Sequence, residues 1–157
     1  MPCLKDGETK VIESMDIVRY IEGKYPEPRL LAESHAEQMD LLSPIFPAFA
    51  KFMKNPEFCP DREKAFLDSL QALESHLATS KFVCGDDSPS VADYSIAPKL
   101  LHAQVTTRKF TPESCSKLSE QCPNIADYMT RMCSDSSFSK AKPADDLITW
   151  GWGEARK

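Results

Sequence analysis

Residues 90–102 read S-V-A-D-Y-S-I-A-P-K-L-L-H, and they predict the start of a helix. Ser90 and Asp93 are three residues apart, as the two partners of a capping box are, with Asp in place of the usual Glu or Gln. The apolar residues that follow recur at helical spacing, at Ile96, Leu100, Leu101 and Val105. Pro98 lies inside this pattern and removes one backbone hydrogen bond, so we expect the helix to bend there.

Further helical patterns lie on both sides of this stretch. The first runs from about residue 35 to 54, and Pro44 and Pro47 predict a kink or a break in it. The second begins near Asp61, which is suited to an N-cap, and runs to about residue 79. The sequence predicts a mainly helical bundle. Its remaining parts are short helices at 112–121 and 123–134 and a tail with Trp150 and Trp152.

The beginning of the chain follows a different pattern. Two strand-like pieces, at 3–5 and 10–12, flank Asp6-Gly7-Glu8, and Asp-Gly is a strong signal for a hairpin turn. From Ser14 the apolar residues fall at helical spacing, and Gly23, Pro26 and Pro28 are expected to end that helix. A single hairpin is only marginally stable in water, so we expect this one to pack on other elements.

Composition and charge exclude several classes of function. With 157 residues, 41% of them apolar and 27% charged, the chain is expected to form a soluble domain with a full core. The net charge is −5 and there is no basic run, which argues against a nucleic-acid partner. No apolar stretch approaches the roughly 20 residues of a membrane span. The six cysteines lack zinc-ligand spacing and no signal peptide is apparent, so we expect free thiols and no metal.

Catalytic motifs are also missing. The sequence contains no G-x-S-x-G, P-loop or H-E-x-x-H pattern, and each histidine stands alone in an amphipathic context. A reactive thiolate needs a helix N-terminus or a basic neighbour, and only Cys115 is a weak candidate for that position. Trp150 and Trp152 could line a cleft or pack back on the bundle. We therefore assign no catalytic residue.

Glu13 and Ser14 stand where the strand pattern gives way to the helical one. The N–H groups and partial positive charge of a helix N-terminus attract a carboxylate. Ser14 is placed to cap the helix, and its hydroxyl could equally donate to a bound carboxylate, while Glu13 could hold an ammonium group. The two together suit an α-amino-acid head, such as the γ-glutamyl end of glutathione. The simpler interpretation, a plain cap beside a solvated acid, stays open on the residues alone.

Several stretches together resemble the glutathione transferase superfamily, and most of all its dehydroascorbate reductases. E-S-M-D-I-V-R-Y-I-E-G-K-Y-P-E-P (13–28) resembles their strand-to-helix segment. S-P-I-F-P-A-F-A-K-F-M-K-N-P (43–56) is similar to the first helix of the helical domain in dehydroascorbate reductases and chloride intracellular channel proteins. Residues 90–102 resemble the family's capping-box helix, and 137–152 the tail of plant-type dehydroascorbate reductases. The resemblance covers nearly the whole chain.

The resemblance implies a mainly α fold with a bundle of the glutathione transferase C-terminal type at 29–157. Residues 1–28 would be the hairpin and helix at the end of a thioredoxin-like domain. It also implies glutathione as co-substrate, dehydroascorbate as small-molecule substrate, no metal, and a monomer located in the cytoplasm or in a plastid.

The resemblance also implies roles for four residues. Glu13 and Ser14 would contact the γ-glutamyl group, and Met1 would offer its backbone to the cysteine of glutathione. Pro2 would take the position of the family's cis-proline, although the residues alone favour a trans proline at a frayed terminus.

One part of the family pattern has no match. The C-P-F-type motif that carries the catalytic cysteine, with the first two strands and helices, does not occur in this sequence. We therefore expect a partial dehydroascorbate reductase that keeps the glutathione-binding Glu-Ser pair and is inactive alone. The alternatives are a non-catalytic helical interaction module with an exposed apolar face, or another glutathione transferase or transferase-like glutaredoxin.

Overall fold

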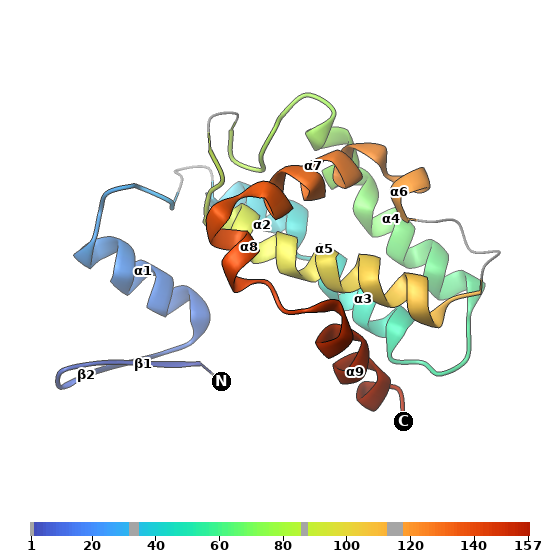
Figure 1. Cartoon of the computed structure of the whole chain (residues 1–157). Coiled ribbons are helices and arrows are strands. Elements are labelled where there is room, and N and C mark those ends of the chain that lie inside the picture. The colour runs from blue at the N-terminus through green and yellow to red at the C-terminus, as the bar shows by residue number, and fades with distance from the viewer. Residues whose placement is uncertain (1, 32–34, 86–87, 113–117) are drawn as a thin grey trace.

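The computed structural model describes residues 2–31, 35–85, 88–112 and 118–157. In this part of the chain it shows a mainly helical fold that begins with a β-hairpin (Figure 1). The mainly α fold class expected from the sequence is confirmed. The elements follow in the order β1 (Cys3–Asp6), β2 (Thr9–Ile12), α1 (Ser14–Lys24), α2 (His35–Leu42), α3 (Ile45–Met53), α4 (Pro60–Leu77), α5 (Val91–Phe110), α6 (Leu118–Gln121), α7 (Pro123–Ser134), α8 (Ser136–Ala141) and α9 (Asp145–Ala155).

The hairpin forms as its turn signal predicts. β1 and β2 pair antiparallel, with Cys3 opposite Ile12 and Asp6 opposite Thr9, so Gly7 and Glu8 form a two-residue loop. Gly7 has a φ of 59°, a conformation that glycine adopts without steric cost. The hairpin packs on α1, which runs beside the bundle in Figure 1.

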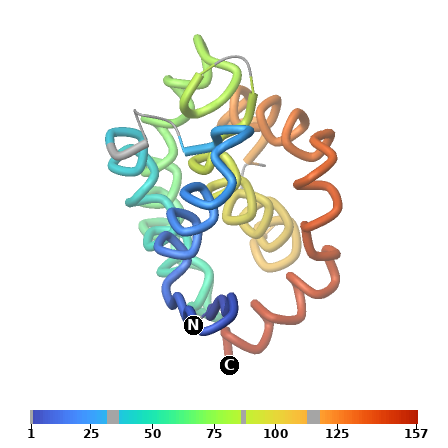
Figure 2. The backbone as a smooth tube through the Cα atoms, turned by 90° about the vertical axis from the view of Figure 1, so that its left-hand side faces the viewer, coloured from blue at the N-terminus to red at the C-terminus, as the bar shows by residue number. Residues whose placement is uncertain are grey.

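The core of the molecule lies in the bundle, where α3, α4, α5 and α7 meet. Figure 2 shows α5 running between α2–α4 on one side and α7–α9 on the other. Aromatic and aliphatic side chains of α3, α4, α5 and α7 are fully buried, among them Phe49, Phe66, Leu70, Ile96, Leu100, Ile125 and Met129. Residues on α1 are only partly buried or exposed, so the bundle carries most of the apolar burial.

The predicted capping box at the start of α5 is confirmed and extended. The N–H and the hydroxyl of Ser90 each lie 2.8 Å from Oδ2 of Asp93. The other carboxylate oxygen, Oδ1, accepts from the N–H of Val83 at 2.9 Å and from the hydroxyl of Tyr128 at 3.1 Å. Burial and the nearby Asp93 raise the pKa of Tyr128 well above its ordinary value. One buried carboxylate thus joins the start of α5 to α7 and to the preceding loop.

Two proline effects decide helix boundaries. The pattern over 35–54 is broken at Pro44, which separates α2 from α3, as the prolines predict. The N-cap assigned to Asp61 is wrong, because α4 begins at Pro60 and its N-cap is Cys59. The fixed φ of proline suits the first helical position, so the helix starts two residues earlier than expected.

The C-terminal tail that carries Trp150 and Trp152 contains two helices, α8 and α9. Asp135 caps α8 by accepting from the N–H of Ser137 at 3.0 Å and of Phe138 at 2.8 Å. At the other end of α9, Arg156 donates to the carbonyl oxygens of Met53 at 2.5 Å and Pro56 at 2.8 Å. The contacts of Arg156 with residues far away in the chain stabilise α9, which is too short to persist alone.

Within the described residues, no helix is both long and apolar enough to cross a bilayer. The five cysteines that the structure describes are free thiols, as expected. Cys115, the weak nucleophile candidate, falls at 113–117, outside the described residues.

Candidate functional site

The junction between β2 and α1 carries an unusual backbone conformation. Glu13, the residue just before α1, has φ 74° and ψ 130°, outside the regions that L-residues normally occupy. Holding a non-glycine residue in such a conformation costs about 1–3 kcal/mol, and such residues cluster at functional sites. No local signal in the sequence indicates this conformation, because glutamate does not favour positive φ.

Ser14 does not cap the helix, and that expectation is wrong. It is the first helical residue of α1, Glu13 takes the N-cap position, and no side chain caps this helix end. The hydroxyl of Ser14 makes no hydrogen bond to any residue that the structure describes. The first backbone bond of the helix runs from the N–H of Ile17 to the carbonyl of Glu13, at 3.0 Å.

This helix end therefore presents hydrogen-bond donors of the kind that attract an anion. The amides of Ser14, Met15 and Asp16 precede the first backbone bond of α1, and amides at a helix start point outward along the axis. Together with the exposed Ser14 hydroxyl they offer several donors to one carboxylate. The exposed Glu13 carboxylate beside them suits an ammonium group.

The hairpin ladder ends next to both Pro2 and Glu13. Cys3 and Ile12 form its last pair, and Pro2 and Glu13 are the residues that adjoin this pair in the two strands. Pro2 is exposed there. Met1, and with it the peptide bond to Pro2, lies outside the described residues.

Asp6, Tyr20 and Lys24 hold α1 on the hairpin. The hydroxyl of Tyr20 donates to Oδ2 of Asp6 at 2.9 Å, and the Lys24 ammonium pairs with the same oxygen. Hydrogen bonds from Lys24 and then from Tyr20 lower the pKa of Asp6. The bond to Asp6 raises the pKa of Tyr20 and that of Lys24. This network fixes the direction in which the start of α1 points.

The structure places two thiols at helix N-termini, and the sequence analysis did not predict either position. Cys59 and Cys122 are the N-caps of α4 and α7, and each precedes a proline at the first helical position. The Cys-Pro dipeptide is the signal that could have identified both, since proline is enriched at that position. Burial raises the pKa of Cys122 to about 11. Acidic Asp61 and Glu63 occupy the first turn of α4, close to Cys59 in the sequence.

The two tryptophans have different surroundings. Trp152 is buried against α3 and α5, with its ring centroid 4.7 Å from that of Phe49. Its indole Nε1 donates to Nδ1 of His102 at 3.1 Å. Trp150 is 68% exposed. The sequence left open whether the two tryptophans line a cleft or pack on the bundle. Of the two residues, Trp152 packs on the bundle and Trp150 does not.

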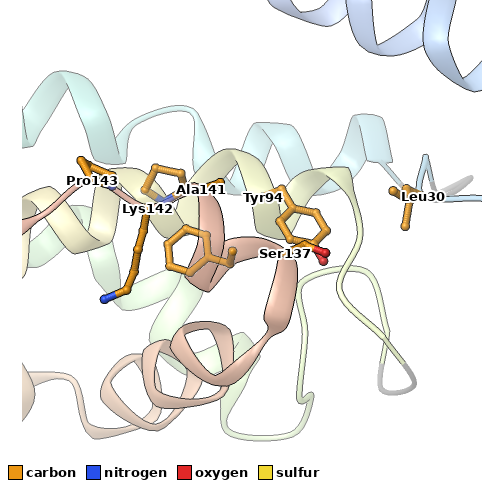
Figure 3. A pocket seen from close by; sticks show the side chains of 8 residues that line it. Leu30, Tyr94, Ser137, Ala141, Lys142 and Pro143 are labelled. Carbon is orange, nitrogen blue, oxygen red and sulfur yellow. The ribbon is translucent and has the colours of Figure 1, made fainter.

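A separate cavity of about 360 Å³ lies between α5 and α8. Its wall consists of side chains from α5, α8, the segment after α8 and the connection before α2: Leu30, Tyr94, Pro98, Ser137, Phe138, Ala141, Lys142 and Pro143. Figure 3 shows Tyr94 and Ser137 toward one end, Lys142 and Pro143 toward the other, and Ala141 between them. In the part of the chain that the structure describes, no group of three or more His, Cys, Asp or Glu side chains could hold a metal ion.

Comparison with known proteins identifies sequence relatives over almost the whole chain. A family model described as glutathione S-transferase, C-terminal domain, matches residues 34–131. A rice (Oryza sativa subsp. japonica) protein named probable glutathione S-transferase DHAR1, cytosolic, is 37% identical over 97% of this chain and 70% of the relative. Arabidopsis thaliana glutathione S-transferase DHAR2 is 34% identical over 97% of this chain and 70% of the relative.

Two solved structures have the same fold. Rice GST1 (OsGSTU1), solved in complex with glutathione, matches 99% of this chain and 74% of its own with a TM-score of 0.80 at 17% identity. Chlamydomonas reinhardtii dehydroascorbate reductase matches 99% of this chain and 72% of its own with a TM-score of 0.78 at 23% identity. At these identities the two structures show a shared fold only.

Proposed function

Since the chain belongs to the glutathione S-transferase family, we propose that it binds glutathione and serves in the glutathione-dependent reduction of dehydroascorbate. The names of the rice and Arabidopsis relatives support this proposal. In that reaction two glutathione thiols supply two electrons and two protons to dehydroascorbate. Ascorbate and glutathione disulfide are the products.

The observation that carries the proposal is the backbone of Glu13 at the uncapped start of α1. In our proposal the Ser14 hydroxyl and the first amides of α1 hold the α-carboxylate of the γ-glutamyl group. The Glu13 carboxylate holds its ammonium. The φ of 74° places a carboxylate-bearing residue at a position where glycine would be the less strained choice.

Pro2 and Met1 complete the proposed site. Pro2 would stand beside the cysteine of glutathione; in support, it adjoins the last pair of the ladder, as Glu13 does on the other strand. Met1 would offer its backbone to the same cysteine. We assign binding roles to these residues and no catalytic one, so we expect little or no dehydroascorbate reduction by this chain alone.

We further propose a division between residues 1–28, with thioredoxin-like character, and a helical domain at 29–157. The packing of the hairpin on α1 supports this division. A cytoplasmic location is proposed from the name of the rice relative, with a plastid as the alternative because other relatives are named chloroplastic.

Calorimetric titration tests the binding proposal. We expect glutathione to bind, and cysteinylglycine, which lacks the γ-glutamyl group, to bind at least about tenfold more weakly. Ser14→Ala should weaken glutathione binding, whereas Ser139→Ala, at an exposed serine of α8, should leave it unchanged. Equal binding of the two ligands would remove Glu13 and Ser14 from the site.

A turnover assay separates binding from catalysis. Ascorbate formation from dehydroascorbate and glutathione is followed by the absorbance of ascorbate, with free glutathione alone as the background. A rate at background level together with glutathione binding agrees with the assigned roles. Substantial turnover would show that a thiol in this chain acts as nucleophile.

One observation favours the alternative of a non-catalytic interaction module. Ile12, Ile21 and Tyr25 are 53%, 43% and 63% exposed on the hairpin and around α1. Apolar residues exposed close together mark interaction surfaces. Sedimentation velocity across a range of protein concentrations tests for self-association. A monomer at all concentrations argues against self-association through this face.

A further inference from the structure

The cavity between α5 and α8 is a second site on the molecule, and we propose that it binds a small ligand with an apolar body and one carboxylate. Its volume of about 360 Å³ falls within the range of small-molecule sites, about 300–1,000 Å³. None of the residues that line it belongs to the Glu13–Ser14 site. The proposal therefore stands independently of the glutathione site.

The apolar lining of the cavity favours a ligand with an apolar body. Pro98 contributes from α5, and Phe138 and Ala141 contribute from α8. Leu30 and Pro143 add apolar atoms at its two sides. Among the lining residues that the structure describes, none carries a carboxylate. Removing apolar ligand surface from water here is favourable by about 25 cal/mol per Å².

Lys142 provides the positive charge that favours a carboxylate on the ligand. Among the described residues of the wall it alone is charged, and its ammonium has no ion-pair partner in the same part of the chain. At the opposite end the Tyr94 hydroxyl donates to Asp135 at 3.2 Å. Asp135 therefore places negative charge near that end. An anionic ligand is expected to direct its carboxylate toward Lys142 and its apolar end toward Tyr94.

The cavity is formed before any ligand arrives. Phe138 is 4% exposed and sits on α8, whose start is capped by Asp135. Leu30 is held by its carbonyl oxygen, which accepts from the N–H of Val91 at 2.9 Å. Its own N–H donates to Glu22 of α1 at 3.3 Å. Little ordering is then required on binding, which favours affinity for a small ligand.

The probe pair is 4-phenylbutyrate and the neutral 4-phenylbutan-1-ol, titrated into the isotope-labelled chain and followed by ¹H–¹⁵N NMR. We expect both to shift the amides of 94–98 and 137–142, with the acid bound about two- to fivefold more tightly, the range of an exposed ion pair. Equal affinity of acid and alcohol, or shifts confined to other elements, overturns the proposal. Shifts that depend on protein concentration without probe would indicate a second copy as the occupant and also overturn it.

Matched variants locate the site. Lys142→Gln should abolish the preference for the acid, whereas Lys140→Gln, at an exposed lysine outside the wall, should retain it. Ala141→Phe should weaken both probes at least about fivefold, because the larger side chain occupies the cavity. A preference that survives Lys142→Gln, or unchanged binding in folded Ala141→Phe, contradicts the assignment.

Discussion

The indole N–H of Trp152 in α9 donates to Nδ1 of His102 in α5 across 3.1 Å. An indole N–H can only donate, so His102 must accept at Nδ1 and carry its proton on Nε2. The pair holds the last helix on the bundle through residues that are 50 positions apart.

Replacing His102 should loosen α9. His102→Leu leaves the half-buried indole N–H without an acceptor, and we expect the free energy of unfolding to fall by about 1–3 kcal/mol. His102→Gln keeps an acceptor on a side chain of similar reach and should lose less. Chemical denaturation of the three proteins measures this. Equal stability of the Leu and Gln variants would show that packing, not the hydrogen bond, is what matters.

The same pair predicts an acid dependence of stability. Burial lowers the pKa of His102 below its ordinary 6.5, so the unfolded chain takes up the proton more readily than the folded one. The stability from neutral His102 is full above about pH 6.5 and is lost as pH falls through the lowered pKa. The difference in unfolding free energy between wild type and His102→Gln should shrink over that range. A difference that is constant with pH would mean that His102 does not titrate on unfolding.

Glu13→Gly should separate strain from binding. Glycine adopts a φ of 74° without steric cost, so we expect the free energy of unfolding to rise by up to about 1 kcal/mol. Glutathione binding should nevertheless weaken, because the carboxylate is gone. Glu13→Ala is the control, since it loses the carboxylate but keeps the strain, and it should weaken binding without raising stability. Calorimetry and denaturation on both variants test the two effects separately.

Asp93→Ala should be among the most destabilising substitutions in the chain. It leaves the buried donors of Val83, Ser90 and Tyr128 without their acceptor, and we expect a loss of about 2–5 kcal/mol. Tyr128→Phe removes only one of these bonds and should cost about 1 kcal/mol. Thermal and urea denaturation give both values. A loss below that of Tyr128→Phe would refute the central role of this carboxylate.

Lys24→Gln should raise the pKa of Asp6 toward its ordinary value, because the bond from Lys24 is the largest cause of its lowering. NMR titration of the Asp6 carboxyl carbon measures the change. Arg19→Gln, which removes an exposed pair with Asp16 on the same helix, should leave Asp6 as it is. Since the pKa of Asp6 is lowered on folding, its contribution to stability is present above its ordinary value of 3.8 and is lost as pH falls.

Sequence alone determined the features that depend on neighbouring residues. The Asp-Gly turn, the break at Pro44 and the Ser90–Asp93 capping box each involve a few adjacent positions, and all three are present. The local pattern also predicts that Glu13 and Ser14 lie at the start of α1. Such features can be predicted because the backbone and the nearest side chains supply the whole cause.

Only the tertiary structure decided the features that depend on residues far apart in the chain. The backbone of Glu13, the helical state of residues 136–141 and 145–155, and the burial of Trp152 but not Trp150 are of this kind. A short helix such as α9 is stabilised mainly by the partners it packs against, here on α3 and α5. The cavity between α5 and α8 likewise exists only once elements separated along the chain have packed together.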